Sequence, residues 1–600
     1  MPTAPAASQT LHQIVPTGTA QAAYPKAMSE PEHGPRSDRP DAGAPLGIEN
    51  YGSATPFAYG RDLWERSILF WDTLRQRADN MIAHERAGKP PLLNFDYEIL
   101  LDARQFERPV NYALAAIRKY DDKCIDDCLD PAKPPVVVVD PRAGHGPGIG
   151  GFKRDSEVGI AMHEGHAVYF VLFYPDPAPG QTIADVLHVL RRFVMEVSKR
   201  HEGAAPILYG NCQAGWAIAI LAADCEGLAG PAVLNGSPLS YWGGEAGINP
   251  ARVSGGLLGG AWLTHLTADL GNGRFDGAWL VQNFENLKPE AVWEKYANLL
   301  VHVDEERDRF LEFERWWNGY YFLSREEMLA IVENLFIGNK FEQGLLRVCE
   351  CCFADLRRIR NPIVIFASRG DNITPPHQAL GWIPTVYGST EDLKRAGQRI
   401  VYLINSHVGH LGIFVSASVA RLEHRAILEH LDEISALAPG LYEMRIDNPT
   451  GNHDCKREAY TVHFEERRVE ELRFPENRTA FRRVAEVSTR LDELYSASLG
   501  KWVRATSTPL SALLLEWFHP MRTSRLMFAT AFNPLSSFLM PLAASMRQDR
   551  HGAPDTNPYK AAELKAFDAI GGAIAEARQQ RDAMYELWFE FFYGRREGTK

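Results

Sequence analysis

The residues best suited to chemistry form the hexapeptide Gly210-Asn211-Cys212-Gln213-Ala214-Gly215. An apolar run at 207–209 precedes it, and a helix-forming run at 216–223 follows it. A strand, a tight turn with small neighbours and then a helix is the context of a nucleophile elbow, where the nucleophile occupies a strained backbone position. Gly210 and Ala214, two residues on either side of the cysteine, would leave room for the chain to double back. The thiol of Cys212 is therefore the candidate nucleophile of an acyl-transfer reaction.

The position of this cysteine allows two interpretations. At the N-terminus of a helix, the positive end of the helix dipole favours a thiolate over a thiol, and a thiolate suits thioester chemistry. Alternatively, Cys212 is a small buried residue without a chemical role, because free cysteine is among the most buried residue types. The hexapeptide alone does not separate the two.

Two later loops supply the acid and the base in the chain order that this type of site shows, nucleophile first, then acid, then base. An apolar run at 362–367 predicts a strand, and Asp371 lies in the loop after it. A second strand-like run at 401–404 leads to a loop with two histidines. We take His410 as the general base, and His407 is the competing candidate.

An oxyanion hole in such a site combines two backbone N–H groups. One would come from Gln213, directly after the nucleophile, and the other from the loop 141–148, where Arg142 or Ala143 would be the donor. The glycines of this loop could instead indicate a phosphate-binding cradle, but the Walker pattern with Lys followed by Ser or Thr is missing. We favour the oxyanion role.

The elements that must position these loops alternate along the chain. Short continuous apolar runs predict strands buried on both faces, and amphipathic or apolar helical patterns lie between them. This order predicts an α/β protein with a mostly parallel central sheet covered on both faces. The expected strands are 134–140, 167–173, 206–209, 232–235, 362–367 and 399–404, and the clearest helices between them are 183–199 and 216–225.

The domain organisation follows from changes in composition. Residues 1–50 are rich in Ala, Pro, Ser, Thr and Gly and are expected to form a disordered tail. An N-terminal helical region at 51–130 would precede a catalytic domain at 131–438. Within that domain, residues 255–345 lose strand signals and are expected to form a helical cap or, alternatively, an ordinary helical subdomain. Residues 439–600 are expected to form a mainly helical C-terminal extension of α+β type.

Local patterns refine the two ends of the chain. Residues 62–86 place apolar side chains at helical spacing and predict one amphipathic helix. The runs 459–464 and 469–474 resemble strands at the start of the C-terminal extension. The apolar stretch 526–546 is interrupted by Asn, Pro and Ser, so it suits a buried or surface-docking helix better than a membrane span.

Composition excludes several classes of function. The net charge of −12, without a run of Lys and Arg, gives no electrostatic site for a nucleic acid. Eight irregularly placed cysteines and the lack of an apolar signal core indicate a reducing cytoplasm. The crowded run Cys349-Glu350-Cys351-Cys352 lacks a second ligand cluster for a tetrahedral metal site. We expect no metal, no cofactor and no membrane span.

From about Gly60 to Gly412 the chain resembles the polyhydroxyalkanoate synthases, especially the bacterial synthase-like proteins with a long C-terminal extension. The residues that carry the resemblance are Cys212 in the cysteine version of the lipase box, Trp317-Asn318-Gly319, Asn339-Lys340-Phe341, and the loops that hold Asp371 and His410. The resemblance implies an α/β-hydrolase fold. It departs from the family at Ala214, where glycine is usual, and at Asp140-Pro141-Arg142-Ala143, where the family has a Pro-Pro-Trp pattern, and these changes concern polymerisation more than acyl transfer.

The resemblance also implies a reaction. Cys212 would form a covalent thioester with a 3-hydroxyacyl group from coenzyme A, His410 would act as its base, and Asp371 would activate the substrate hydroxyl or orient the histidine. The implied partners are an acyl-coenzyme A substrate and the surface of a polyester granule in the cytoplasm. A homodimer is a further candidate assembly, and the sequence does not decide the oligomeric state. Two alternatives stay open: a thioesterase or polyester hydrolase with the same triad, and a granule-associated scaffold without catalysis.

Overall fold

The computed structural model of the 600-residue chain describes residues 55–594, except for 121–122, 125–128, 226, 349–352, 449–459, 473 and 475–476. The tail predicted at 1–50 and the cysteine run at 349–352 lie outside the described residues.

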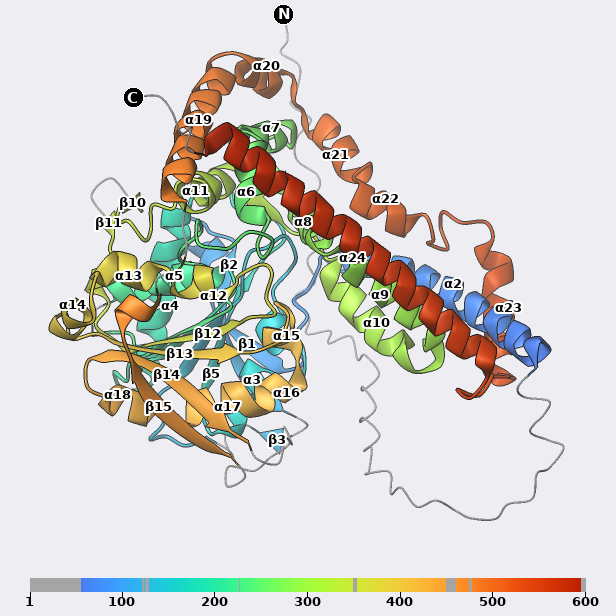
Figure 1. The fold of residues 1–600 in the computed structure, drawn as a ribbon, viewed down its shortest axis with the longest axis horizontal. Coiled ribbons are helices and arrows are strands. Elements are labelled where there is room, and N and C mark those ends of the chain that lie inside the picture. The colour runs from blue at the N-terminus through green and yellow to red at the C-terminus, as the bar shows by residue number, and fades with distance from the viewer. Residues whose placement is uncertain are drawn as a thin grey trace, which may run out of the picture. The chain divides into compact units, whose positions relative to one another are not determined.

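A large mixed sheet organises the chain, with the strand order β1-β2-β5-β4-β6-β7-β12-β13-β14-β15 and β3 beside β2 (Figure 1). The strands from β5 to β14 in this order run parallel, and the outer pairs are antiparallel. The six strands predicted from apolar runs are confirmed. The parallel strands are β4 (Val136–Val139), β5 (Val168–Phe173), β6 (Ile207–Asn211), β7 (Ala232–Asn235), β12 (Ile363–Ser368), β13 (Arg399–Asn405) and β14 (Gly440–Asp447).

Each central strand contributes side chains to two hydrophobic cores, because successive side chains point to opposite faces of a sheet. In β4, Val137 and Val139 join the core formed with α4 (Ile183–Arg200) and α5 (Ala214–Asp224). Val136 and Val138 join the core on the other face, which contains side chains of α3 (Glu157–His163), α17 (Arg425–Glu429) and α18 (Leu431–Ala436). The continuous apolar runs exist because both faces are covered. The chain has the α/β-hydrolase fold.

The first part of the described chain is less helical than the sequence indicates. The predicted amphipathic helix is α2 (Pro56–Arg86), but the strands β1 (Asp96–Asp102), β2 (Tyr112–Tyr120) and β3 (Lys123–Cys124) follow it and form one edge of the sheet. Among the described residues of 51–130, α-helix therefore occurs in α2 alone, with one short 3-10 helix at Ala103–Gln105. The side chains of β1 are exposed or partly buried, so this edge strand lacks the continuous apolar run that marks the central strands.

The other edge of the sheet extends beyond the boundary expected at residue 438. Strand β14 pairs in parallel with β13, and β15 (Thr461–Arg467) pairs antiparallel with β14. The strand predicted at 469–474 is wrong, because Val469–Leu472 is a 3-10 helix. Val469 and Leu472 are both buried in the sheet's core, and a spacing of three residues brings two side chains to one side of such a helix.

A helical cap is inserted between β7 and β12. A two-stranded ladder of β8 (Arg274–Asp276) and β9 (Phe322–Ser324) lies within it, and a bridge between His145 and Tyr320 joins it to the loop after β4. Its helices are α6 (Ala251–Leu257), α7 (Trp262–Leu270), α8 (Ala278–Leu287), α9 (Pro289–Val301), α10 (Val303–Trp317) and α11 (Arg325–Ile331).

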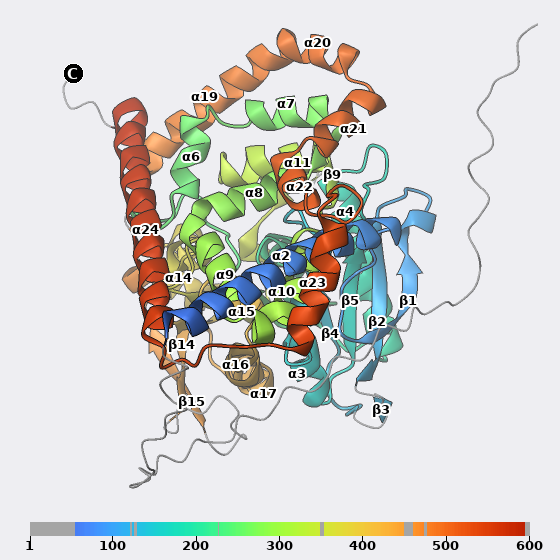
Figure 2. The ribbon, with the colours of Figure 1, turned by 90° about the vertical axis from the view of Figure 1, so that its right-hand side faces the viewer.

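The C-terminal helices pack against the cap and α2 and not against the sheet (Figures 1 and 2). Contacts join α23 to α2, α24 to α9 and α6, α19 and α20 to α7, and α22 to α8. None of the helices in the described ranges is both long enough and apolar enough to span a bilayer. These helices are α19 (Arg478–Ala497), α20 (Leu499–Thr506), α21 (Pro509–Trp517), α22 (Pro520–Leu526), α23 (Ser536–Gln548) and α24 (Pro558–Tyr593).

Candidate active site

The turn between β6 and α5 has the geometry of a nucleophile elbow. Cys212 adopts φ = 48°, in the left-handed region that non-glycine residues rarely occupy, and its N–H donates to the carbonyl of Asn235 at 2.8 Å. A Cβ on Gly210 would lie 2.7 Å from Ile218, and a Cβ on Gly215 would lie 2.1 Å from the hydroxyl of Ser237. The glycines are therefore required two residues before and three residues after the cysteine, which is consistent with alanine at position 214.

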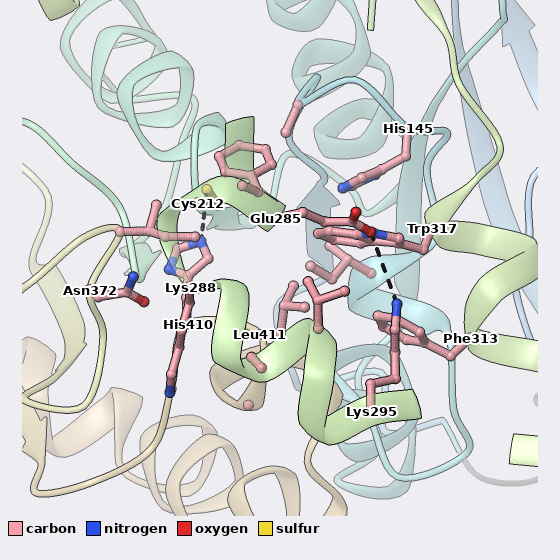
Figure 3. A pocket seen from close by; sticks show the side chains of 18 of the residues that line it. His145, Cys212, Glu285, Lys288, Lys295, Phe313, Trp317, Asn372, His410 and Leu411 are labelled. Atoms are coloured by element: carbon pink, nitrogen blue, oxygen red, sulfur yellow. Dashed lines mark hydrogen bonds and ion pairs between the residues drawn. The ribbon is translucent and has the colours of Figure 1, made fainter. Parts of the chain in front are cut away.

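The structure brings the three predicted catalytic side chains together (Figure 3). The Nε2 atom of His410 lies 3.1 Å from the sulfur of Cys212, and its Nδ1 atom lies 2.6 Å from a carboxylate oxygen of Asp371. The other carboxylate oxygen of Asp371 accepts hydrogen bonds from the backbone N–H groups of Ile373 and Thr374, both at 2.8 Å. All three side chains are buried. Both carboxylate oxygens of Asp371 have hydrogen-bond partners, and these bonds orient the histidine and the loop.

These side chains converge because their loops leave neighbouring parallel strands at the same edge of the sheet. Cys212 follows β6, Asp371 follows β12 and His410 follows β13. The strands β6, β7, β12 and β13 are consecutive in the sheet. The competing histidine, His407, is exposed, and its ring contacts the hydroxyl of Ser406 at 2.8 Å instead of entering the site.

Electrostatics favour a charged histidine in this site. Burial opposes the charging of His410, but the carboxylate of Asp371 and the adjacent Cys212 together raise the pKa of His410 well above its usual value. The arrangement therefore stabilises an imidazolium beside the sulfur.

A cavity of about 320 Å³ opens beside the sulfur. The loops of the sheet form one wall, and the cap helices α8, α9 and α10 form the other. This volume is at the lower end of the range of about 300–1,000 Å³ for small-molecule sites. Its lining is mostly apolar and consists of Pro141, Ala143, His145, Ile149, Cys212, Phe284, Glu285, Lys288, Ala291, Val292, Lys295, Phe313, Trp317, Gly370, Asn372, Ile373, Gly409, His410, Leu411 and Gly412.

The structure separates the two loop residues considered for the oxyanion hole. Ala143 lines the cavity together with Cys212, whereas the side chain of Arg142 is directed to Glu327, at 2.8 Å, and to the carbonyl of Phe322. Gln213 is the residue that precedes α5, at the position where the first N–H groups of a helix have no partner within the helix. Of these two residues, Ala143 is the one that lines the cavity.

A buried polar network that the sequence did not reveal lies beneath the elbow. The amide of Asn211, directly before the nucleophile, donates to Asp140 at 3.2 Å and to Glu157 at 2.5 Å, and Asn235 donates to Glu157 at 3.2 Å. Burial raises the pKa of Asp140 to about 6 and raises the pKa of Glu157 well above its usual value. The network fixes the backbone on either side of Cys212. Its members are isolated polar residues in apolar runs, which is the one signal that could have identified them.

The cap also contributes charged residues to the cavity that the sequence analysis did not identify. Glu285, Lys288 and Lys295 line it from α8, α9 and the residue between these helices. Lys288 lies at the break between the two helices, so no single helical spacing in the sequence identifies the three residues. Glu285 is held from two directions, by the indole N–H of Trp317 at 3.0 Å and by Arg525 of α22 at 2.7 and 2.9 Å. The C-terminal extension therefore contacts the wall of the cavity.

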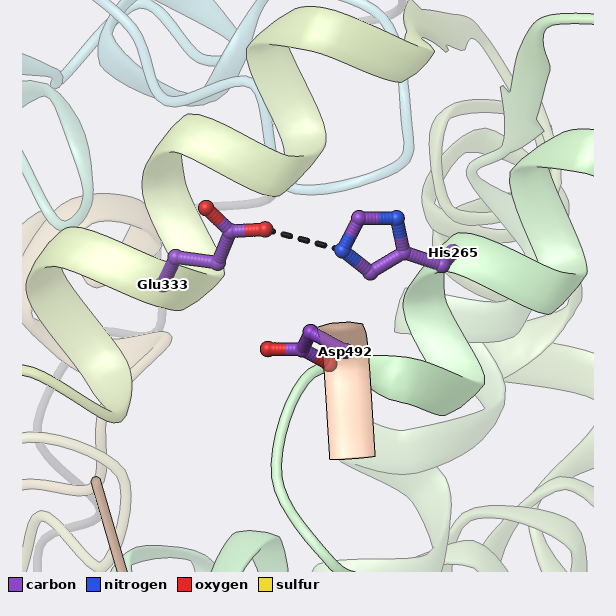
Figure 4. A group of neighbouring side chains, drawn as sticks. All are labelled: His265, Glu333 and Asp492. Carbon is purple, nitrogen blue, oxygen red and sulfur yellow. Dashed lines mark hydrogen bonds and ion pairs between the residues drawn. The ribbon is translucent and has the colours of Figure 1, made fainter. Parts of the chain in front are cut away.

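One cluster of the described residues has the ligand types of a metal site, His265, Glu333 and Asp492 (Figure 4). The Nε2 atom of His265 lies 2.9 Å from Glu333, and its Nδ1 atom lies 3.0 Å from the guanidinium of Arg325. Because a guanidinium only donates, Nδ1 must be the acceptor, and the neutral ring then carries its proton on Nε2. A metal ligand needs that nitrogen unprotonated, so the arrangement favours a polar contact between the cap and α19 over a metal site.

The chain is similar in sequence to a protein family and to a relative. The family model described as "Protein of unknown function (DUF3141)" matches residues 62–597. The chain is also 44% identical over 550 residues to a Rhizobium meliloti protein described as "Uncharacterized protein in ackA 5'region". That match covers 90% of this chain and 74% of the relative.

Solved structures with similarity to the chain include a lipase candidate from Acinetobacter baumannii AYE, with a TM-score of 0.33 and 12% identity over 61% of this chain and 97% of that chain. The thioesterase domain from the curacin biosynthetic pathway has a TM-score of 0.31 and 10% identity, over 56% of this chain and 99% of that domain. At these identities no activity can be carried over to this chain.

Proposed function

The chain belongs to the DUF3141 family, and we propose that it is an enzyme that transfers acyl groups through a covalent thioester on Cys212. The observation that carries this proposal is the 3.1 Å contact between the sulfur of Cys212 and Nε2 of His410, at the wall of a cavity large enough for an acyl group. The strained backbone of Cys212 and the orienting contact from Asp371 support it, because a catalytic nucleophile and its base need both.

The first half of the reaction forms the acyl-enzyme. The sulfur of Cys212 attacks the carbonyl carbon of an acyl thioester while His410 holds the proton that the cysteine has given up. The oxyanion that develops is stabilised by the backbone N–H groups of Gln213 and Ala143. The bond to the leaving thiolate then breaks, and that thiolate takes the proton from Nε2 of His410.

The second half returns the enzyme to its starting state. His410 accepts the proton of an acceptor hydroxyl as its oxygen attacks the acyl carbon of the thioester on Cys212. The carbon–sulfur bond breaks, and the proton passes back to the cysteine–histidine pair. Throughout, Asp371 keeps the ring of His410 in the orientation that directs Nε2 to the sulfur.

The substrate class that we assign is the 3-hydroxyacyl thioesters of coenzyme A. Support comes from the resemblance to polyhydroxyalkanoate synthases, from the apolar lining of the cavity and from the exposed ammonium group of Lys288 at its edge, which suits an anionic carrier. No metal is needed for this chemistry.

Intact-protein mass spectrometry after incubation with 3-hydroxybutyryl-coenzyme A tests the proposal. The wild type should gain the mass of one hydroxyacyl group and release coenzyme A, and Cys212→Ala should do neither. A Cys212→Ala protein that still acquires the acyl group would refute the assignment of the nucleophile. If this variant also supports every measurable function of the protein in cells, a scaffold without catalysis is the better interpretation.

Hydrolysis is the second candidate, and the size of the cavity favours it. A volume of about 320 Å³ accommodates a short acyl group but leaves little room for a growing polyester chain. In that case water, not a hydroxyl of the substrate, attacks the thioester. Product analysis separates the two reactions, because transfer gives chains of increasing length and hydrolysis gives free 3-hydroxy acid.

A further inference from the structure

Three successive C-terminal helices and their connections present large apolar side chains to solvent. We call this set the outer surface. The most exposed members are Phe538 at 76%, Phe518 at 74% and Leu535 at 67%. The full set is Leu510, Leu513, Leu514, Leu515, Trp517 and Phe518 from α21 and its end, Met527, Phe532 and Leu535 from the connection between α22 and α23, and Phe538 and Met540 from α23.

The inner faces of α22 and α23 carry ion pairs. Arg522 and Arg525 of α22 are buried and contact Asp276 and Glu285 of the cap, and Arg547 of α23 contacts Asp72 of α2. An ordinary surface helix buries its apolar face and exposes its charged face. Here ion pairs and a small apolar cluster with Ala543 and Met546 attach the helices to the protein, and the larger apolar side chains stay uncovered.

An uncovered apolar area of this size indicates an interface. Aromatic side chains bury about 150–250 Å² each, so the four aromatic members alone, when half or more exposed, offer on the order of 400 Å². The seven Leu and Met members bring the total to roughly 800 Å², which is about the area that each partner contributes to a stable protein–protein interface. Isolated exposed apolar residues need no explanation, but a set of this size does.

The composition of the outer surface identifies the partner as protein and not lipid. From Leu526 to Met546 the sequence contains no charged residue, and the arginines of α22 and α23 face inward. Helices that bind a lipid surface flank their apolar face with outward Lys and Arg, which this surface lacks within the described residues of α21–α23. Enrichment in aromatic residues and Met with depletion of charge is the composition of the core of a homodimer interface.

We propose that the outer surface of α21–α23 is the interface through which two copies of this chain form a symmetric dimer. A two-fold axis pairs the same surface on both subunits, so a single apolar face supplies both sides of the contact. Trp71 of α2, which packs against Phe528, and Trp279 of α8, which packs against His519, are half exposed at its margin and extend it onto the cap and α2. The inference does not depend on the proposed reaction.

Sedimentation velocity of the full chain at micromolar concentration tests the proposal. The wild type should sediment with twice the 67.2 kDa mass of the chain. The double variant Leu514→Glu/Phe538→Glu places two carboxylates in the interface and should weaken dimerisation at least about 100-fold, giving monomers. Since both side chains are already exposed, the substitutions should leave the circular dichroism spectrum and the melting temperature of the monomer unchanged.

The matched control is Met195→Glu on α4. This side chain is 48% exposed in the sheet domain, so a carboxylate placed there should leave the dimer intact. A monomeric wild type would overturn the proposal. Flotation of the wild type, but not of the double variant, with phosphatidylcholine vesicles would also overturn it, because the surface would then bind lipid. A dimer that persists in the double variant would place the interface elsewhere.

Discussion

In the sheet domain, strands such as β4 bury every side chain, on both faces. In α21–α23, by contrast, the large side chains Trp517, Phe518 and Phe538 lie in solvent. The sheet and its flanking helices supply two continuous cores, whereas α23 buries only Ser536 and Ala543. Outside the cap, the described part of the 131–438 domain exposes one large apolar side chain, Met195.

The two regions therefore differ in the interactions that stabilise them. Apolar burial contributes about 25 cal/mol per Å², and the sheet domain obtains this contribution within one chain. The outer apolar side chains of α21–α23 do not obtain it within one chain, and these helices are held by ion pairs to the cap and α2 together with a small apolar cluster that includes Ala543 and Met546. Changes in the sheet should therefore act on catalysis and folding, and changes in the helices on attachment and assembly.

The largest effect should come from His410→Ala, a substitution in the sheet domain. Without the base, the cysteine loses the group that takes and returns its proton, and we expect kcat to fall at least about 10³-fold. Coenzyme A release from 3-hydroxybutyryl-coenzyme A measures the fall. Sedimentation of this variant should match that of the wild type, and a concurrent loss of assembly would show that the two regions are not independent.

Asp371→Asn should lower the rate by about 10²–10⁴-fold, because an amide cannot hold the ring of His410 in the same way. The substitution also removes the carboxylate that, against the effect of burial, raises the pKa of His410. The imidazolium should then lose its proton at lower pH, so the basic limb of the kcat/KM profile should move to lower pH. An unmoved basic limb would contradict the role that we assign to this carboxylate.

Gly215→Ala tests the close packing of the elbow. The added Cβ would lie 2.1 Å from the hydroxyl of Ser237, so we expect a loss of about 1–3 kcal/mol in the free energy of unfolding. Chemical denaturation measures this loss, and the double variant Gly215→Ala/Ser237→Gly should recover part of it. The matched control is Gly572→Ala in α24, where a Cβ meets nothing within 4 Å and the higher helix propensity of alanine should stabilise the helix slightly.

The smallest effect should come from Arg525→Met, which breaks the attachment of α22 to the cap. Glu285 still accepts the hydrogen bond from the indole N–H of Trp317. We therefore expect the free energy of unfolding to fall by about 1–2 kcal/mol, measured by chemical denaturation. The double variant Arg525→Met/Glu285→Gln should lose less, because no unpaired carboxylate remains. Breaking the exposed pair Arg191–Asp224 with Arg191→Met is the control and should change little. Equal losses in both single variants would mean that the buried pair has no special role.

Much of the candidate site at the edge of the sheet could be predicted from the sequence, because it depends on local patterns. The apolar run of β6, the turn at Cys212 and the helix after it all have signals within a few residues. The order of Cys212, Asp371 and His410 along the chain then restricts the choice of acid and base. Their convergence follows from the parallel order of the strands and needs no further information.

The remainder could not be predicted because it depends on contacts between distant segments. Val469 and Leu472 resemble part of a strand, but their burial against the sheet selects a 3-10 helix. Arg142 and Ala143 are equivalent candidates by sequence, and only the cavity, which the distant cap helps to form, distinguishes Ala143 as a lining residue. The inward orientation of the arginines of α22 and α23 depends on the acids that they contact in the cap and in α2.

The pairing of Arg525 with Glu285 has a consequence for substrate entry. The cap forms one wall of the cavity, and helices from both ends of the described chain are fastened to it, α2 through Arg77 to Glu314 and α22 through Arg525. A rigid swing of the cap alone would break both attachments and leave buried charges without partners. Admission of a substrate is therefore expected either to carry α2 and α22 along with the cap or to proceed through side-chain motion at the mouth of the cavity.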